Sequence, residues 1–236
     1  MEHGATRQGN ELLHSFLALR KAVGFIGMAL PFVVLLAHGG VLESVSAGYY
    51  TRGSAIFVAG VCAIGFFLLF YRGYDRRDRI ASFVAGAAAL VVGQVPCACG
   101  QRDGPAFLWG WGADYAASAW PAVHLLAAAV LFGVLAMFCL WLFPMSDEPP
   151  HANPKKDQRN LTYYACGSVI VACLLALFVH FVVAKWLGSS GVFWLETVML
   201  LAFGFSWAVK GEAIAFLNDS GAAAPSAGAG YSQRAA

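Results

Sequence analysis

The stretch WPAVHLLAAAVLFGVLAMFCLWLF, residues 120–143, contains no aspartate, glutamate, lysine or arginine. A helix crosses the hydrocarbon core of a bilayer, which is about 30 Å thick, with roughly 17–25 predominantly apolar residues. The stretch meets this requirement and therefore predicts a membrane-spanning helix. The fold of the whole chain then depends on how many such runs it contains.

The composition of the whole chain favours a membrane protein. Of its 236 residues, 59% are hydrophobic and only 12% are charged, and the mean hydropathy is +0.65. A soluble domain has about 45–50% apolar and about 25% charged residues, so the excess apolar surface is expected to face lipid. The net charge of +2 argues against a nucleic-acid partner, which needs a clustered basic face.

Six runs are long and apolar enough to span, so the predicted fold class is all-α, a six-helix transmembrane bundle. The first run exceeds the apolar core of about 7–15 residues found in cleavable signal peptides, and it is predicted to stay as a helix. Residues 1–21 are predicted to form a cytoplasmic segment, and residues 213–236 a disordered tail. The predicted spans are 22–42, 54–71, 80–96, 120–143, 163–186 and 192–209, within a membrane domain of residues 22–212.

The lysines and arginines predict how the bundle is oriented. If the N-terminus is cytoplasmic, Arg52, Arg102 and Lys185 fall outside, and the other twelve of the 15 lysines and arginines fall inside. Because cytoplasmic loops carry an excess of these residues, both termini are predicted to be cytoplasmic, which fits an even number of spans.

Ionisable residues are few within the predicted spans, and such residues are costly in lipid and often functional. His38, His124, His180 and Glu196 all lie nearer the predicted outer face, at the level of the loop LESVSAGYYTRG, residues 42–53. Polar groups that share a cavity can satisfy one another, whereas groups turned to lipid cannot. We therefore expect one outward-facing pocket. Its predicted ligand-binding residues are Ser46, Tyr49, His124 and Glu196, while Glu43 and Tyr50 are expected at the interface.

Other interpretations of these residues remain open. Imidazole and carboxylate groups bind zinc, but H-x-x-x-H and H-E-x-x-H spacings are absent, so no metal and no cofactor are predicted. Ser46 and His124, with a carboxylate to orient the imidazole, would suit nucleophilic catalysis. Glu196 could instead form an interfacial ion pair with Lys185.

Two further predictions concern residues away from this pocket. Asp75 and Lys210 lie within a turn of the predicted inner lipid boundary, and we expect a structural ion pair between them. Cys97 and Cys99 lie in a predicted outer loop, where disulfides persist, and the sequence leaves their redox state open.

Several segments together resemble an uncharacterised family of small bacterial multi-pass membrane proteins, domain of unknown function 998. The resemblance runs over residues 20–212 and implies a multi-pass protein of the bacterial inner membrane, without supplying an activity. The segments are ESVSAGYYT (43–51), FYRGYD (70–75), the helix that opens with His124, RNLTYYACG (159–167) and FWLETVMLLAFGFSWAVKGE (193–212).

The expected function is binding of a small ligand or a lipid headgroup in the outward-facing pocket, without catalysis, in a protein surrounded by membrane lipid. A membrane-embedded lipid hydrolase, with or without a metal, is the alternative. A proton or ion pathway is the weaker alternative, because the inner halves of the fourth and fifth predicted spans are almost wholly apolar.

Overall fold

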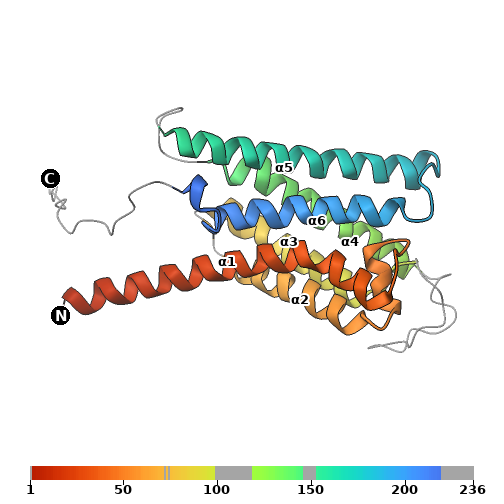
Figure 1. The fold of residues 1–236 in the computed structure, drawn as a ribbon, viewed down its shortest axis with the longest axis horizontal. Coiled ribbons are helices and arrows are strands. Elements are labelled where there is room, and N and C mark those ends of the chain that lie inside the picture. The colour runs from red at the N-terminus through yellow and green to blue at the C-terminus, as the bar shows by residue number, and fades with distance from the viewer. Residues whose placement is uncertain (1, 72, 74, 99–118, 146–152, 219–236) are drawn as a thin grey trace.

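The computed structural model of the protein describes residues 2–71, 73, 75–98, 119–145 and 153–218. Within these residues the chain is helical and has no β-strand (Figure 1). The main helices are α1 (Glu2–His38), α2 (Ser54–Phe70), α3 (Arg76–Gln94), α4 (Trp120–Met137), α5 (Pro154–Phe178) and α6 (Gly191–Lys210). The short elements are the 3-10 helices η1 (Val45–Tyr50) and η5 (Ala215–Leu217) and the π-helical turns η3 (Phe138–Leu142) and η4 (Val179–Val183), which continue α4 and α5.

The main helices of the described chain form a closed ring in chain order. Each helix packs against the next, and α6 packs against α1. Because consecutive helices run in opposite directions, the N-terminal end of α1 and η5 lie at one end of the bundle, and η1 lies at the other (Figure 1). We call these the basic end and the η1 end.

The first helix differs from its prediction at both ends. It runs without a break from Glu2, so the predicted separate segment 1–21 is instead continuous with the helix, and its N-terminal part projects beyond the bundle (Figure 1). It stops at His38 rather than at residue 42. Gly39 adopts a φ of 84°, and its N–H and that of Gly40 both donate to the carbonyl of Leu35. This left-handed glycine cap ends the helix.

Glycines allow α1 and α6 to pack backbone against backbone. A Cβ atom on Gly24 would lie 2.7 Å from the carbonyl oxygen of Gly204 and 2.9 Å from the backbone nitrogen of Ala208. Such close approach through small residues is typical of helices that associate in membranes, where van der Waals contact drives packing. The contact closes the ring and brings the start of α6 beneath the loop that follows α1.

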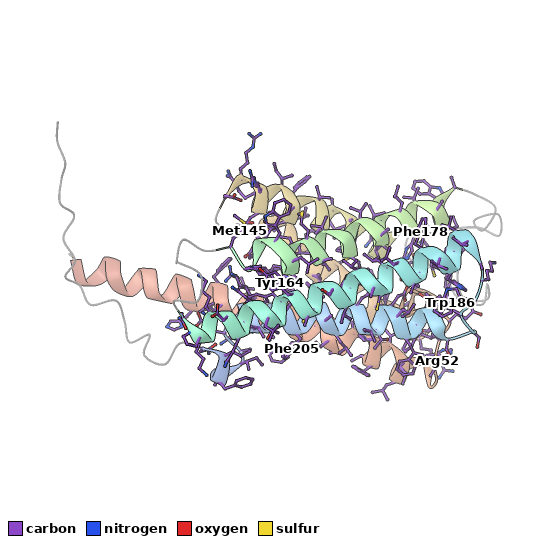
Figure 2. All side chains as sticks on the ribbon, turned by 90° about the horizontal axis from the view of Figure 1, so that it is seen from above. Arg52, Met145, Tyr164, Phe178, Trp186 and Phe205 are labelled. Atoms are coloured by element: carbon purple, nitrogen blue, oxygen red, sulfur yellow. The ribbon has the colours of Figure 1, made fainter. Side chains whose placement is uncertain are left out.

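Four helical segments are long and apolar enough to cross a membrane, as expected for a membrane protein. They are His14–His38, Trp120–Leu142, Pro154–Val183 and Gly191–Lys210. The apolar helix α2 is shorter, with 17 residues, and the first turn of α3 is charged. Large apolar side chains cover the outside of the bundle, and Phe178 and Trp186 are each more than half exposed (Figure 2). An apolar surface of this extent suits lipid rather than water.

The ordered chain also extends beyond two predicted boundaries. Helix α5 begins at Pro154 rather than at residue 163, because the Asn153 side chain caps it and accepts from the backbone N–H of Lys155 at 2.9 Å. After α6, the chain remains ordered to Asn218, and Arg159 donates to the carbonyl of Leu217 at 2.8 Å. The rest of the predicted tail, residues 219–236, lies outside the described residues.

Candidate functional site

The loop between α1 and α2 folds over the first turn of α6. The backbone N–H of Phe193 donates to the carbonyl of Glu43 at 3.1 Å. The Ser44 hydroxyl donates to Oε2 of Glu196 at 2.7 Å, and the backbone N–H of Val45 donates to the same oxygen at 2.6 Å. Three hydrogen bonds therefore join this loop to α6, and two of them fix the Glu196 carboxylate.

Local sequence explains the shape of the loop. Ser44 has an extended backbone and is the N-cap of η1, where its hydroxyl accepts from the N–H of Ser46 at 3.1 Å. Gly48 lies against α1, since a Cβ atom there would come within 2.5 Å of a methyl carbon of Val34. The Thr51 hydroxyl donates to the carbonyl of Gly48 at 2.9 Å and closes the turn. The loop is thus a compact cap on the bundle.

Glu196 is partly buried near the start of α6. The hydrogen bonds from Ser44 and Val45 both go to Oε2, and together with Ser46 the carboxylate forms the polar end of the cavity described below. Among the described residues, Glu196 forms no ion pair, and Lys185, its predicted alternative partner, is exposed. A carboxylate removed from water costs free energy unless donors or charge compensate it. The Glu196 position therefore favours a ligand that supplies a donor or a positive charge.

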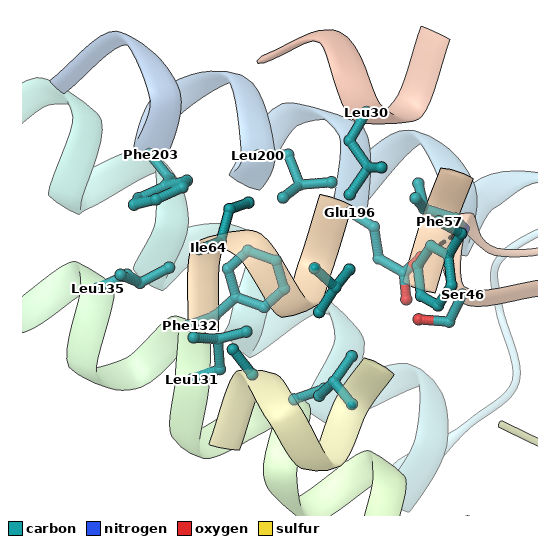
Figure 3. A pocket seen from close by; sticks show the side chains of 15 residues that line it. Leu30, Ser46, Phe57, Ile64, Leu131, Phe132, Leu135, Glu196, Leu200 and Phe203 are labelled. Atoms are coloured by element: carbon teal, nitrogen blue, oxygen red, sulfur yellow. Dashed lines mark hydrogen bonds between the residues drawn. The ribbon is translucent and has the colours of Figure 1, made fainter. Parts of the chain in front are cut away.

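A cavity of about 50 Å³ lies inside the bundle below η1 (Figure 3). Ser46 and Glu196 form its polar end, and all its other described lining side chains are apolar. They come from η1 and from α1, α2, α3, α4 and α6, and they include Leu30, Phe132 and Phe203. The structure thus brings two of the four predicted binding residues to one cavity.

His124 lies close to this cavity but does not line it. Its side chain is 5% exposed, and Nδ1 lies 2.5 Å from the carbonyl oxygen of Val95, at the end of α3. Ala128, one turn further along the same face of α4, lines the cavity. The imidazole therefore faces the bundle interior, as expected, and ties α4 to α3.

Tyr49 is also buried near the cavity without lining it, and its ring packs edge-on against Tyr50 with the centroids 5.5 Å apart. Tyr50, which is expected at the interface, is partly buried and donates to the carbonyl of Cys97 at 2.6 Å. Burial, with a smaller contribution from Tyr49, raises the pKa of Tyr50, which keeps this donor protonated. Cys97 itself is disulfide-bonded. Glu43 is exposed, as expected.

His38 and His180 do not join this site. His38 is exposed at the end of α1, and Nδ1 of His180 accepts from the backbone N–H of Leu187 at 3.2 Å. In the part of the chain that the structure describes, no three histidine, cysteine or acidic side chains cluster as metal ligands would.

The basic end of the bundle holds a second polar cluster, but not the predicted pair of Asp75 and Lys210. Asp75 is exposed, and its carboxylate caps α3 by accepting from the backbone N–H of Asp78 at 3.0 Å. Among the described contacts, Lys210 donates to the carbonyl of Phe143 at 3.2 Å. Arg20 is buried and donates to the Tyr71 hydroxyl at 2.8 Å and, at 3.4 Å, to the carbonyl of Lys210. Asp75 acts as a helix cap because the first turn of α3 offers it backbone donors.

Sequence reasoning missed Ser44, whose hydroxyl donates a hydrogen bond to Glu196. A signal was present, because serine is a preferred N-cap and Ser44 directly precedes the six residues of η1. Comparisons with protein-family models, with curated proteins and with solved structures found no match.

Proposed function

We propose that the protein is a six-span protein of the bacterial inner membrane whose outward-facing pocket binds a small ligand or a lipid headgroup, without catalysis of its own. The observation that carries this proposal is the Glu196 carboxylate, which the loop holds through Oε2 and which lines a cavity inside the bundle. A preformed, mostly apolar cavity with a few placed polar groups is the usual form of a small-ligand site.

The six-span topology is supported by two independent features. The ring of helices places the start of α1 and the end of α6 at one end of the bundle. The lysines and arginines concentrate on the side that this arrangement assigns to the cytoplasm. Reporter tags at residues 1 and 236 should therefore both report from the cytoplasm, and periplasmic labelling of either tag would rule out the proposed topology.

The geometry gives less support to hydrolysis. A serine nucleophile needs a base within hydrogen-bond reach. The predicted nucleophile Ser46 makes no hydrogen bond to His124 among the described contacts, and Nδ1 of His124 lies against the carbonyl of Val95. The serine that contacts a carboxylate is instead Ser44, and no imidazole lies in hydrogen-bond contact with it. An ion pathway also receives little support, because the cavity is apolar below Glu196. Ligand binding requires neither a contact between serine and histidine nor a polar path through the bundle, and it remains our proposal.

Ligand retention during purification tests the proposal. Native mass spectrometry of the protein released from mild detergent should detect a bound small molecule or lipid in the wild type. Glu196→Gln should lower its occupancy at least several-fold, because the amide keeps the shape and an acceptor but loses the charge. Glu43→Gln is the matched control, since this exposed carboxylate belongs to the same loop. Equal occupancy in all three proteins would contradict the proposal.

A further inference from the structure

The basic end of the bundle carries an excess of positive charge. From Arg20 onward, the described residues at this end include four acidic side chains, Asp75, Asp78, Asp157 and Glu212. Against these stand nine lysines and arginines, namely Arg20, Lys21, Arg76, Arg77, Arg79, Lys155, Lys156, Arg159 and Lys210. The η1 end is balanced in the described part of the chain, with Arg52 and Lys185 against Glu43 and Glu196. An excess of this kind attracts anions.

Arg20 is a buried cation that has no counter-ion among the described residues. Its side chain is 8% exposed, and its two hydrogen bonds go to neutral oxygens, those of the Tyr71 hydroxyl and the Lys210 carbonyl. Its guanidinium carbon lies 4.4 Å from the ring centroid of Phe16 and 5.3 Å from that of Tyr71. Its buried Nε has no hydrogen-bond acceptor. Neutral oxygens and aromatic faces stabilise the cation, but they do not neutralise its charge.

Two further cations lie close to Arg20, on neighbouring helices. Lys210 is the last residue of α6, and Arg159 lies in the second turn of α5. The charges of Arg20 and Arg159 both act on Lys210 and on the Tyr163 hydroxyl, and Asp78 is the carboxylate that acts on Lys210. Arg159 and Lys210 are partly exposed. Three cations thus lie together at this end, and two of them reach the surface.

The position of this cluster favours the phosphate of a lipid as the missing anion. A guanidinium binds phosphate oxygens through charge-assisted hydrogen bonds, and basic pockets between helices on the cytoplasmic side of a membrane bind anionic headgroups. Large apolar side chains accompany the cations. Leu161, two residues after Arg159, and Phe216, whose carbonyl accepts from Lys155, are both more than half exposed. They offer contacts to acyl chains, which a soluble phosphate lacks.

From these features we infer that the basic end binds an anionic phospholipid. Its phosphate lies beside Arg159 and Lys210 at the surface, with the charge of Arg20 behind them, and its acyl chains lie against the apolar outside of α5 and η5. In the proposed topology this lipid belongs to the cytoplasmic leaflet. The site is separate from the Glu196 pocket, which lies at the other end of the bundle, and it does not depend on ligand binding there.

Two lipids with the same acyl chains test the role of headgroup charge. Dioleoyl phosphatidylglycerol is anionic and dioleoyl phosphatidylcholine is zwitterionic. Each is titrated separately into the purified full-length protein in a nonionic detergent, and the bound lipid is counted by native mass spectrometry. Because each lysine or arginine near an anionic headgroup strengthens binding about fivefold, phosphatidylglycerol should bind at least about fivefold more tightly than phosphatidylcholine.

Variants assign this preference to the cluster. Arg159→Gln and Lys210→Gln should each weaken phosphatidylglycerol about fivefold and change phosphatidylcholine much less. Arg20→Gln should act in the same direction, and the two surface variants keep the test valid where the buried substitution prevents folding. Arg77→Gln is the matched control, because it removes an exposed charge from the same end on α3, which packs against α2 and α4 rather than α6. This control and Glu196→Gln should both retain the preference. Thermal unfolding verifies that each variant is folded.

Glycerol 1-phosphate, which has no acyl chains, separates a lipid site from a site for soluble phosphate. It should displace phosphatidylglycerol only at a concentration at least about tenfold higher than that of the lipid, because the chains contribute to binding. Displacement at equal concentration would overturn the assignment to a lipid. Equal binding of the two lipids would overturn the inference. So would a preference that Arg77→Gln lowers as much as Lys210→Gln does, because the charge would then act diffusely. None of these results changes the expectation for the Glu196 pocket.

Discussion

Replacing Ser44 by alanine should destabilise the protein far more than replacing Ser46. The Ser44 hydroxyl is buried, donates to the Glu196 carboxylate at 2.7 Å and accepts from the N–H of Ser46 at 3.1 Å. A hydrogen bond to a charged group contributes about 1.5–3 kcal/mol, and losing an N-cap costs about 1 kcal/mol. Because the two effects share one hydroxyl, we expect a loss of about 2–3 kcal/mol in the free energy of unfolding rather than their full sum.

Ser46→Ala is the matched control within the same loop. The Ser46 hydroxyl lines the cavity and makes no hydrogen bond among the contacts of the described residues, so its loss should change the free energy of unfolding by less than about 1 kcal/mol. The assay is thermal unfolding in detergent. For a chain of this size, each kcal/mol shifts the Tm by roughly 2–4 °C, so Ser44→Ala should unfold about 4–12 °C below the wild type.

A double-mutant cycle assigns the effect to the contact with Glu196. In the Glu196→Gln background, Ser44→Ala should cost at least about 1 kcal/mol less than in the wild type, because residues in direct contact are coupled. Two results would refute the reasoning. One is a Ser46→Ala variant at least as destabilised as Ser44→Ala. The other is an effect of Ser44→Ala that Glu196→Gln leaves unchanged, which would mean that the hydroxyl acts only as a helix cap.

Three further predictions concern the glycine contact between α1 and α6, the C-terminal tail, and His124. Gly204→Ala should lower the free energy of unfolding by about 1–3 kcal/mol, because its Cβ atom meets the backbone of α1; Gly133→Ala, which meets nothing within 4 Å, should be neutral or stabilising in the same unfolding assay. Deleting everything after Ser220 should leave the Tm in detergent unchanged, and a drop of several degrees would show that the tail docks on the bundle. His124→Ala should lower ligand occupancy by native mass spectrometry more than Cys97→Ala, because His124 ties α4 to α3 beside the cavity; the reverse order would contradict this assignment.

The positions of the helices could be predicted because their signals are local. Long apolar runs predict the helices themselves, and each of the predicted spans overlaps one described helix. The predicted helix ends were less accurate where a capping residue, rather than the end of the apolar run, sets the helix boundary. Gly39 ends α1 before its apolar run is finished, and Asn153 with Pro154 starts α5 well before its apolar run begins. These capping residues are visible in the sequence, but hydropathy alone does not reveal their effect on helix ends.

The candidate site was only partly predictable, because its contacts depend on how distant segments meet. Equal depth in the membrane was enough to group Ser46 with Glu196, and both line the cavity. Depth could not show which serine of the loop reaches the carboxylate, since that depends on the turn of η1. Nor could it show that Asp75 caps its own helix instead of reaching Lys210.

Glu196 links the stability of the loop to the contents of the cavity. Its carboxylate holds the loop that closes the η1 end, and the same side chain lines the cavity. A bound group that supplies a donor or a positive charge would offset the cost of keeping the carboxylate out of water. The same compensation would stabilise the loop that depends on that carboxylate, and a ligand that binds only the folded state raises its stability according to concentration and affinity. The pocket and its cover are therefore expected to form one cooperative unit, in which the empty site is the less stable state.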